Sequence, residues 1–137
     1  MPDFTLPRTE RLRSLKAIRR MFGEGKSGFV YPYRFIYLVH PAEEQEGQVQ
    51  EAQTDERPVN VMFSVPKKFH KRANRRNLLK RRTREAYRLG REAMCENIAQ
   101  SGCRVDMAFI YSTKECHTYK TINNAVERIM AQVAEHI

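Results

Sequence analysis

Apolar and polar residues alternate most clearly between residues 59 and 65, where the sequence reads VNVMFSV. The odd-numbered positions of this run are all apolar, so they would share one face of a β-strand. Residues 105–111 repeat the pattern, with apolar side chains at every odd position, and predict another strand. Residues 33–39 (YRFIYLV) are rich in aromatic and branched side chains, which also favours a strand. The pattern leaves open whether residues 26–31 add a further short strand.

Spacings of three and four residues predict helices at both ends of the chain. Ser14 would cap the first helix and Gly23 would end it. The last helix would begin near Thr118 or Thr121. The apolar side of the first helix comprises Leu15, Ile18, Met21 and Phe22. The apolar side of the last helix comprises Ile122, Ala125, Val126, Ile129, Met130, Val133 and Ile137.

Residues 76–97 predict one long helix, because they contain no proline, a single glycine and many good helix formers. Two neighbouring faces of this helix differ in character. We expect the first, a narrow face of mostly small side chains, to pack closely on a sheet. It comprises Leu79, Thr83, Ala86, Gly90 and Ala93. The second face is basic and comprises Lys80, Arg84, Arg88 and Arg91.

These elements follow the order α-β-β-β-α-β-α when the possible strand at residues 26–31 is counted. Helices and strands mixed around one sheet indicate an α+β protein, a small two-layer α/β sandwich. A length of 137 residues is typical of one domain, so we expect a single domain over residues 1–137. Residues 41–57 are rich in Glu and Gln and predict a flexible acidic loop. This loop would join the strands at 33–39 and 59–65 as an antiparallel pair.

The charge of the chain is concentrated in one segment. The whole chain carries 25 basic and 16 acidic residues, a net charge of +9. Residues 67–91 alone hold twelve basic residues and one acid, Glu85, which gives +11. Such a field attracts a polyanion, because binding releases the counterions condensed on its phosphates. A solvated helix face with ordinary ion pairs is the alternative, but one acid cannot balance twelve bases.

Several classes of function lack the residues they require. No apolar run is long enough for a membrane span, and the first residues lack the apolar stretch of a secretory signal, so we expect a cytoplasmic protein. Three cysteines without CxxC spacing and four scattered histidines predict no metal site. No P-loop, GxGxxG or HExxH motif occurs, and we find no catalytic group in the protein.

Aromatic side chains offer a second kind of contact to a nucleic acid. Phe35 and Tyr37 would share one face of a strand, and Phe22 lies on the preceding helix. A sheet face with aromatic rings can stack unpaired bases. Taken alone, aromatic residues on a strand are more often part of the core.

The basic helix resembles a known signature. Residues 76–86 (RNLLKRRTREA) resemble the signature of the bacterial ribonuclease P protein subunit, written R-N-R-x-K-R-x-x-R-[EQ]. Residues 63–68 (FSVPKK) resemble the strand that leads into it, and residues 11–25 are similar to the family's first helix. The resemblance covers nearly the whole chain. It departs at Leu78, where the signature has Arg, and Arg75 or Arg82 could replace the missing phosphate contact.

The resemblance implies a role in removing the 5′ leader from precursor tRNA. The protein would be the accessory subunit of this endoribonuclease, and the RNA subunit would carry the active site and bind Mg²⁺. The protein would bind no cofactor alone and would contact neither membrane nor DNA. The implied fold is ribosomal protein S5 domain 2-like, with a left-handed βαβ crossover.

The resemblance also assigns residues to two surfaces. The first would face the catalytic RNA and comprises Arg76, Asn77, Lys80, Arg81 and Arg84, with Arg75, Arg82 and Arg88 beside them. The second would be a cleft between the first helix and the sheet that holds the leader, and its candidates are Phe22, Phe35, Tyr37 and Lys68.

Three other functions are compatible with some of these features. A structural RNA-binding protein of ribosomal type would share the basic helix without any role in cleavage. A small metal-dependent nuclease would need a carboxylate or histidine cluster that the sequence does not reveal. A DNA-binding protein would read the major groove with the basic helix, although that helix also needs an apolar face for the sheet.

Overall fold

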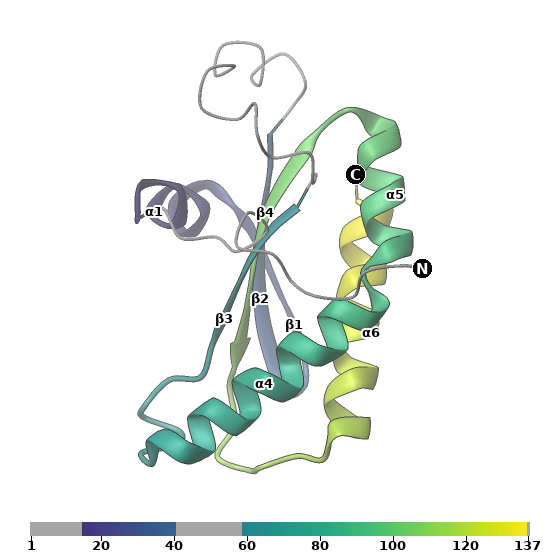
Figure 1. The fold of residues 1–137 in the computed structure, drawn as a ribbon. Helices are drawn as coiled ribbons and strands as arrows, with labels where there is room; N and C mark the ends of the chain where they lie inside the picture. The colour runs from purple at the N-terminus through teal and green to yellow at the C-terminus, as the bar shows by residue number, and fades with distance from the viewer. Residues whose placement is uncertain (1–14, 41–58, 137) are drawn as a thin grey trace.

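A computed structural model describes residues 15–40 and 59–136 of the chain. In these residues a mixed sheet has α1 on one face and α4, α5 and α6 on the other (Figure 1). The elements are α1 (Leu15–Glu24), β1 (Lys26–Val30), β2 (Tyr33–His40), β3 (Val59–Ser64), α4 (Ala73–Gly90), α5 (Glu92–Ser101), β4 (Arg104–Tyr111) and α6 (Tyr119–Glu135). The α+β class and the strands at 33–39, 59–65 and 105–111 are confirmed. The open question at 26–31 is answered by β1.

The strands lie in the order β1-β2-β4-β3. β1 and β2 form an antiparallel hairpin, and β2 is also antiparallel to β4. β3 pairs with β4 in parallel, so the prediction that the strands at 33–39 and 59–65 pair with each other is wrong. β4 takes the place between them because its residues 105–109 are buried on both faces, which suits a central strand.

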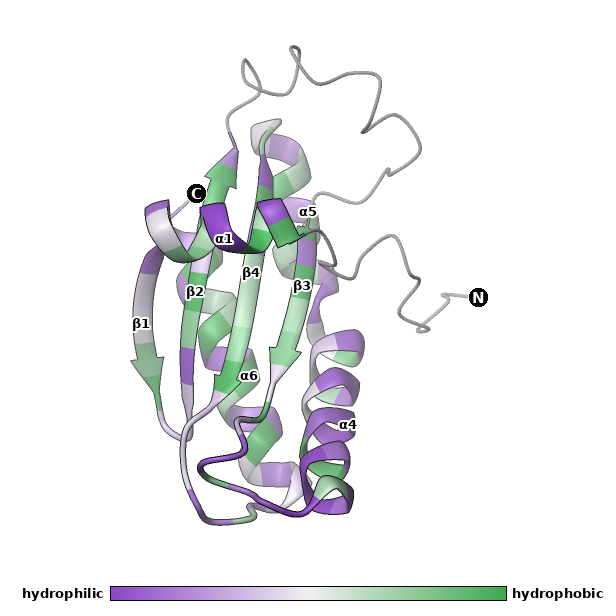
Figure 2. Cartoon of the chain, turned by 90° about the vertical axis from the view of Figure 1, so that its left-hand side faces the viewer, coloured by the Kyte–Doolittle hydropathy of each residue, from purple (hydrophilic) through white to green (hydrophobic). Residues whose placement is uncertain are grey.

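The connection from β3 to β4 is a crossover between parallel strands. Figure 2 views the sheet from the α1 side, with β3 and β4 pointing downward, β4 to the left of β3, and the connecting helices behind. Inverted so that both strands point upward, the view has β4 to the right of β3. A connection that leaves the left strand, passes behind the sheet and enters the right strand is left-handed. About 98% of connections between parallel strands are right-handed. The crossover implied by the resemblance is confirmed.

The predicted helix at 76–97 is divided into two helices at Arg91. Gly90 is a poor helix former, and Arg91 is buried, with 5% of its surface exposed, rather than lying on the basic face as predicted. The break changes which side chains of the second half reach the core. Met94 and Ile98 of α5 are buried, whereas the predicted Ala93 is exposed.

The main core lies between the sheet and α4, α5 and α6. It takes the odd-numbered apolar residues of β3 and β4 and the apolar side of α6, as the sequence patterns predict. Thr118 caps α6 by accepting a hydrogen bond from the main-chain N–H of Thr121. A smaller cluster lies under α1 and is built around Met21, Ile36 and Ala108. Residues 41–57, Ser14 and Ile137, for which predictions were made, lie outside the described residues.

Candidate RNA-binding surfaces

A basic stripe follows the side of α4 that turns away from the sheet. Leu79, Thr83 and Ala86 face the sheet and are buried. The residues on the opposite side repeat at spacings of three and four, so their side chains form one continuous row. Within the described residues, Lys80, Arg81 and Arg84 form no side-chain hydrogen bond or ion pair. The α4 stripe, as this row is named below, comprises Asn77, Lys80, Arg81, Arg84 and Arg88.

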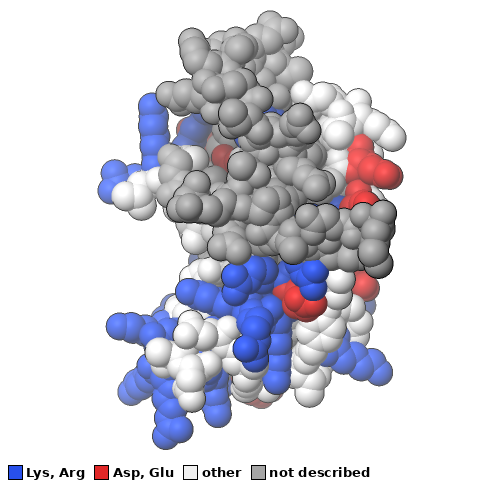
Figure 3. All heavy atoms as spheres, in the orientation of Figure 1, with Lys and Arg blue, Asp and Glu red and all other residues white. Residues whose placement is uncertain are grey.

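The basic surface extends beyond the stripe. Four further basic residues lie in the connection between β3 and α4, and all are exposed. Figure 3 shows Lys and Arg side chains gathered over α4 and over this connection. These like charges repel each other because they lie on one face. Binding of an anion that bridges several of them is therefore favoured. The four residues of the connection are Lys67, Lys68, Lys71 and Arg72.

Two of the predicted RNA-binding arginines bind the protein's own backbone. Nη1 of Arg76 donates to the main-chain oxygens of His70 and Lys71, at 3.1 and 2.7 Å. Nη1 of Arg82 donates to the main-chain oxygen of His117 at 2.7 Å. Each arginine therefore fixes a connection beside α4, and part of its donor capacity is already used.

The structure distinguishes Arg75 from Arg82, the two arginines that could replace the phosphate contact missing at Leu78. Leu78 itself is half-buried, and Arg82 is engaged by His117. The side chain of Arg75 is exposed and has no hydrogen-bond or ion-pair partner among the described residues. Arg75 lies three residues before Leu78, so both side chains lie on adjacent positions of the helix surface. Of the two candidates, Arg75 is therefore the one whose guanidinium is accessible.

Glu85, the single acid of the basic segment, is paired within the helix. Nη2 of Arg88 forms a short ion pair with Oε1 of Glu85 three residues earlier. Arg88 therefore enters the α4 stripe with part of its charge neutralised, unlike Arg81 and Arg84. The free positive charge of the stripe is concentrated in its N-terminal and central turns.

A polar cluster joins three connections at one end of the sheet. Nε2 of His70 lies 2.8 Å from the main-chain oxygen of Thr113, and the hydroxyl of Tyr31 lies 3.3 Å from Oγ1 of Thr113. Nε2 of His117 lies 3.1 Å from the same tyrosine hydroxyl. The β1–β2 turn, the β3–α4 connection and the β4–α6 connection are thus held together beside the start of α4.

Two buried tyrosines support this end of the sheet. Burial raises the pKa of Tyr111 to about 12, and its hydroxyl donates to the main-chain oxygen of Glu115. Burial also raises the pKa of Tyr33. Its hydroxyl bonds to Oγ1 of Thr83, whose own proton goes to the main-chain oxygen of Leu79. Both phenols therefore stay protonated at neutral pH and act as donors.

Two of the predicted leader-binding residues lie on the wrong face of the sheet. Phe35 and Tyr37 are only 3% and 6% exposed and belong to the core under the helices. The ring of Phe35 fills the space above Gly28, where a Cβ atom would lie 2.5 Å from its Cζ. Neither ring can reach a cleft between α1 and the sheet. The core interpretation of these strand aromatics was the right one.

The other two leader-binding candidates are accessible. Phe22 on α1 is 47% exposed, although its neighbour Met21 is fully buried. Lys68 is exposed in the connection after β3, with its Nζ 5.0 Å from the ring centroid of Phe69. The structure therefore keeps Phe22 and Lys68 as candidates.

A different row of side chains crosses the α1 face of the sheet. Figure 2 shows α1 lying across one end of this face, and no other described element covers the opposite end, which is named the uncovered end below. Direct cross-strand pairs place Phe29 beside Arg34, Arg34 beside Ile110, and Ile110 beside Ser64. Phe29 is 60% exposed and Arg34 is also exposed. Sequence reasoning missed this row, although alternation in 33–39 places Arg34 opposite to Phe35 and could have revealed it.

Residues 15–40 and 59–136 hold no group of three or more His, Cys, Asp and Glu side chains arranged to bind a metal. None of its helices combines the length and the apolar character that crossing a bilayer demands. All three cysteines are free.

The sequence matches a known family over most of its length. The family model for ribonuclease P matches residues 6–134. The ribonuclease P protein component of Porphyromonas gingivalis is 30% identical over 136 residues, which cover 99% of this chain and 91% of the relative. The corresponding protein of Chlorobaculum tepidum is 34% identical over 116 residues, covering 80% of this chain and 68% of the relative.

A solved structure has the same fold. The ribonuclease P protein of Staphylococcus aureus superimposes with a TM-score of 0.62 at 18% identity, over 90% of this chain and 94% of that protein. A mutant of the same protein, described as defective in mRNA degradation activity, gives a TM-score of 0.65 at 17% identity, over 91% and 88%. With the signature residues on the exposed side of α4, the family match and these relatives lead to one conclusion: the chain belongs to the ribonuclease P protein family.

Proposed function

We propose that this protein binds two RNA segments in ribonuclease P: the catalytic RNA along the α4 stripe and the 5′ leader of precursor tRNA on the α1 face of the sheet. Family membership makes the chain a protein component of an endoribonuclease that processes tRNA. In this proposal the RNA subunit carries out cleavage with Mg²⁺ that it binds itself. The protein contributes binding energy and orientation.

The observation that carries the proposal is the free positive charge of the α4 stripe. Lys80, Arg81 and Arg84 form one row and have no counter-ion among the described residues. A guanidinium can bind a phosphate through two parallel hydrogen bonds, and a row of cations can follow an RNA backbone. A rigid helix held on the sheet by Leu79 and Ala86 presents these groups without loss of further backbone entropy.

The uncovered end of the α1 face suits a single strand. Phe29 offers a ring on which an unpaired base can stack, and Arg34 beside it offers a phosphate contact. Lys68 follows the far end of this row along the chain and is exposed. Mature tRNA lacks the leader, so contacts on this face would favour substrate over product.

Reconstitution with a ribonuclease P RNA tests both assignments. The assay measures leader cleavage at low Mg²⁺, together with affinity for precursor and mature tRNA. One variant carries Arg81→Ala and Arg84→Ala, and the other carries Phe29→Ala and Arg34→Ala. Lys120→Ala, on the exposed side of α6, is the charge control.

The two variants have different expected defects. The first should assemble poorly with the catalytic RNA, and the second should assemble normally and lose its preference for precursor over mature tRNA. The opposite result would mean that the two surfaces have been exchanged. If neither variant differs from the control, or if the protein alone cleaves precursor tRNA, the proposal is wrong.

A further inference from the structure

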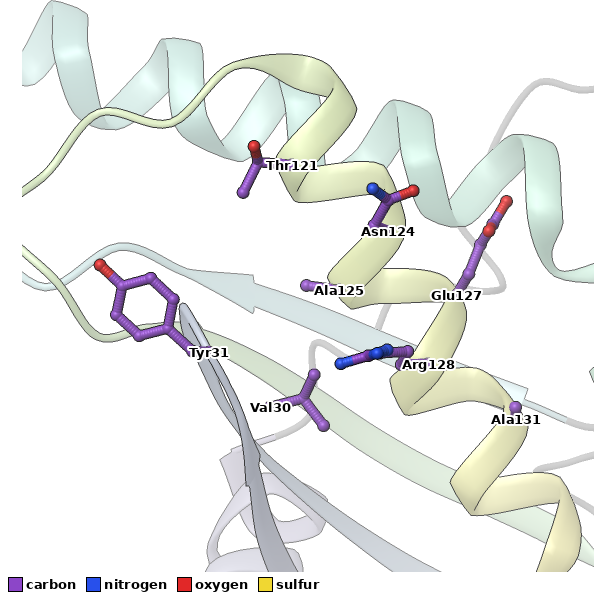
Figure 4. A pocket seen from close by; sticks show the side chains of 8 residues that line it. All are labelled: Val30, Tyr31, Thr121, Asn124, Ala125, Glu127, Arg128 and Ala131. Carbon is purple, nitrogen blue, oxygen red and sulfur yellow. The ribbon is translucent and has the colours of Figure 1, made fainter.

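A cavity of about 590 Å³ lies on the face of the sheet that α4, α5 and α6 cover, between the β1–β2 turn and α6. Val30 and Tyr31 form its wall on the hairpin side (Figure 4). Thr121, Asn124 and Arg128 line it from α6. The cavity is separate from the α4 stripe and from the uncovered end of the α1 face.

The aromatic wall of this cavity is fixed in place. The hydroxyl of Tyr31 lies 3.1 Å from Nε2 of His117 and 3.3 Å from Oγ1 of Thr113. The rings of Tyr31 and His117 meet edge to face, with their centroids 5.3 Å apart. The tyrosine is nevertheless 51% exposed. A ring that is both held and accessible can stack on a planar ligand with little loss of side-chain entropy.

The helical wall supplies exposed polar groups that have no partner among the described residues. The amide of Asn124 and the guanidinium of Arg128 form no hydrogen bond or ion pair with any other described residue. Glu127 also lines the cavity, but Figure 4 shows its side chain pointing away from Tyr31, whereas the side chain of Arg128 is directed toward Val30. Oε1 of Glu127 accepts a hydrogen bond from Asn123 at 3.3 Å. The cavity therefore presents a cation and an amide beside a fixed aromatic ring.

Exposed aromatic side chains connect this cavity with the α1 face. Phe29 belongs to the row across the α1 face, and Tyr31 lies two residues later in the turn. Their ring centroids are 6.4 Å apart, with an angle of 56° between the ring planes. An RNA strand leaving the α1 face at Phe29 would meet Tyr31 next and then the cavity.

We propose that this cavity binds one unpaired nucleotide of a single-stranded RNA that continues from the α1 face around the β1–β2 turn. The base stacks on Tyr31, the amide of Asn124 bonds to the edge of the base, and Arg128 binds the neighbouring phosphate. An amide matches the mixed donors and acceptors of a base edge, and a guanidinium matches a phosphate. The inference extends the leader-binding part of the proposed function and rests on it.

The test uses the reconstituted holoenzyme and precursor tRNAs whose 5′ leaders increase in length. Affinity is measured for the unchanged protein, for Asn124→Ala with Arg128→Ala, and for Lys120→Ala as a control on the same helix. The double variant changes exposed side chains only, and its melting temperature verifies that the fold is intact. Short leaders should bind equally to all three proteins. With leaders long enough to reach the cavity, the double variant should bind at least about tenfold more weakly, because the lost contact of Arg128 with a phosphate alone accounts for a factor of about ten.

Equal affinity of the double variant and the control at every leader length would overturn the inference. Failure of the proposed function has a different result, because Arg34→Ala would then leave the affinity for short leaders unchanged. A photoreactive uridine in the distal part of the leader gives a second measurement. It should cross-link to Tyr31 in the unchanged protein, and cross-linking confined to α1 or α4 would contradict the placement.

Discussion

Nη1 of Arg82 donates a hydrogen bond of 2.7 Å to the main-chain oxygen of His117. This bond ties the basic helix to the β4–α6 connection. Nε2 of His117 lies in turn 3.1 Å from the hydroxyl of Tyr31, in the turn of the β1–β2 hairpin. The basic helix and the turn of the β1–β2 hairpin are therefore joined through the side chains of Arg82, His117 and Tyr31. Arg82 acts first as a positioning residue for this end of the molecule.

Replacing Arg82 by Ala should lower the free energy of unfolding. The substitution removes a charge-assisted hydrogen bond and leaves a half-buried carbonyl group without its donor, a loss of about 1.5 kcal/mol. Arg81→Ala, at the next position of the same helix, removes an exposed side chain without a partner among the described residues and should cost under about 0.5 kcal/mol. Urea unfolding of both variants measures the difference. Equal stabilities would contradict the positioning role.

Two glycines at the end of α1 should respond oppositely to Ala. A Cβ atom at Gly25 would lie 2.5 Å from the main-chain oxygen of Met21 and 2.8 Å from that of Tyr37, so the backbone would have to move. Gly25→Ala should destabilise the protein by about 1–3 kcal/mol. Gly23 has open space around the same position and lies within α1. Gly23→Ala should stabilise the protein by up to about 1 kcal/mol.

Thermal unfolding of the two glycine variants is the appropriate measurement. A lower melting temperature for Gly25→Ala and an unchanged or higher one for Gly23→Ala would agree with the structure. If both variants were destabilised equally, the close approach of α1 and β2 at Gly25 would not be specific.

Stability should decline at alkaline pH. The folded protein raises the pKa of Tyr111 from 10.0 to about 12 because burial disfavours the phenolate. Between pH 10 and 12 the unfolded chain therefore loses this proton while the folded protein retains it. The contribution of Tyr111 is complete below pH 10 and is lost as pH rises toward 12. Tyr33, whose pKa is also raised, acts in the same direction.

Urea unfolding at a series of pH values between 9 and 12 measures this effect. Tyr111→Phe lacks the ionising group, so its stability should fall less steeply over this range than that of the unchanged protein. Identical slopes for the two proteins would show that Tyr111 is not the group responsible.

Much of the fold follows from local patterns. Alternation in 59–65 and 105–111 identifies strands and their buried faces, because each side chain's face depends only on its parity. The pairing of strands depends on partners far apart in the chain. The sequence predicted that the strands on either side of residues 41–57 pair with each other, but β4, which is buried on both faces, lies between them. The break at Arg91 depends likewise on tertiary packing that helix propensity does not describe.

The sequence likewise predicted the part of the candidate sites that depends on local spacing and failed where tertiary packing decides. The α4 stripe is a local pattern, so Lys80, Arg81 and Arg84 could be named from their spacing. Which face of the sheet α1 covers depends on tertiary packing, so the sequence could not show it. Phe35 and Tyr37 were therefore assigned to the wrong face. Arg76 and Arg82 have the same charge as their neighbours in sequence, and only their hydrogen bonds distinguish them.

Binding of the protein to a ribonuclease P RNA, measured as a function of salt, tests the central claim most directly. If the basic surface makes about 6–10 phosphate contacts, affinity should fall about 10³–10⁵-fold between roughly 50 and 200 mM salt. The double variant Arg81→Ala with Arg84→Ala should bind more weakly and lower the salt slope by about two. A flat salt response, or a double variant whose slope and affinity equal those of the Lys120→Ala control, would contradict docking through the α4 stripe.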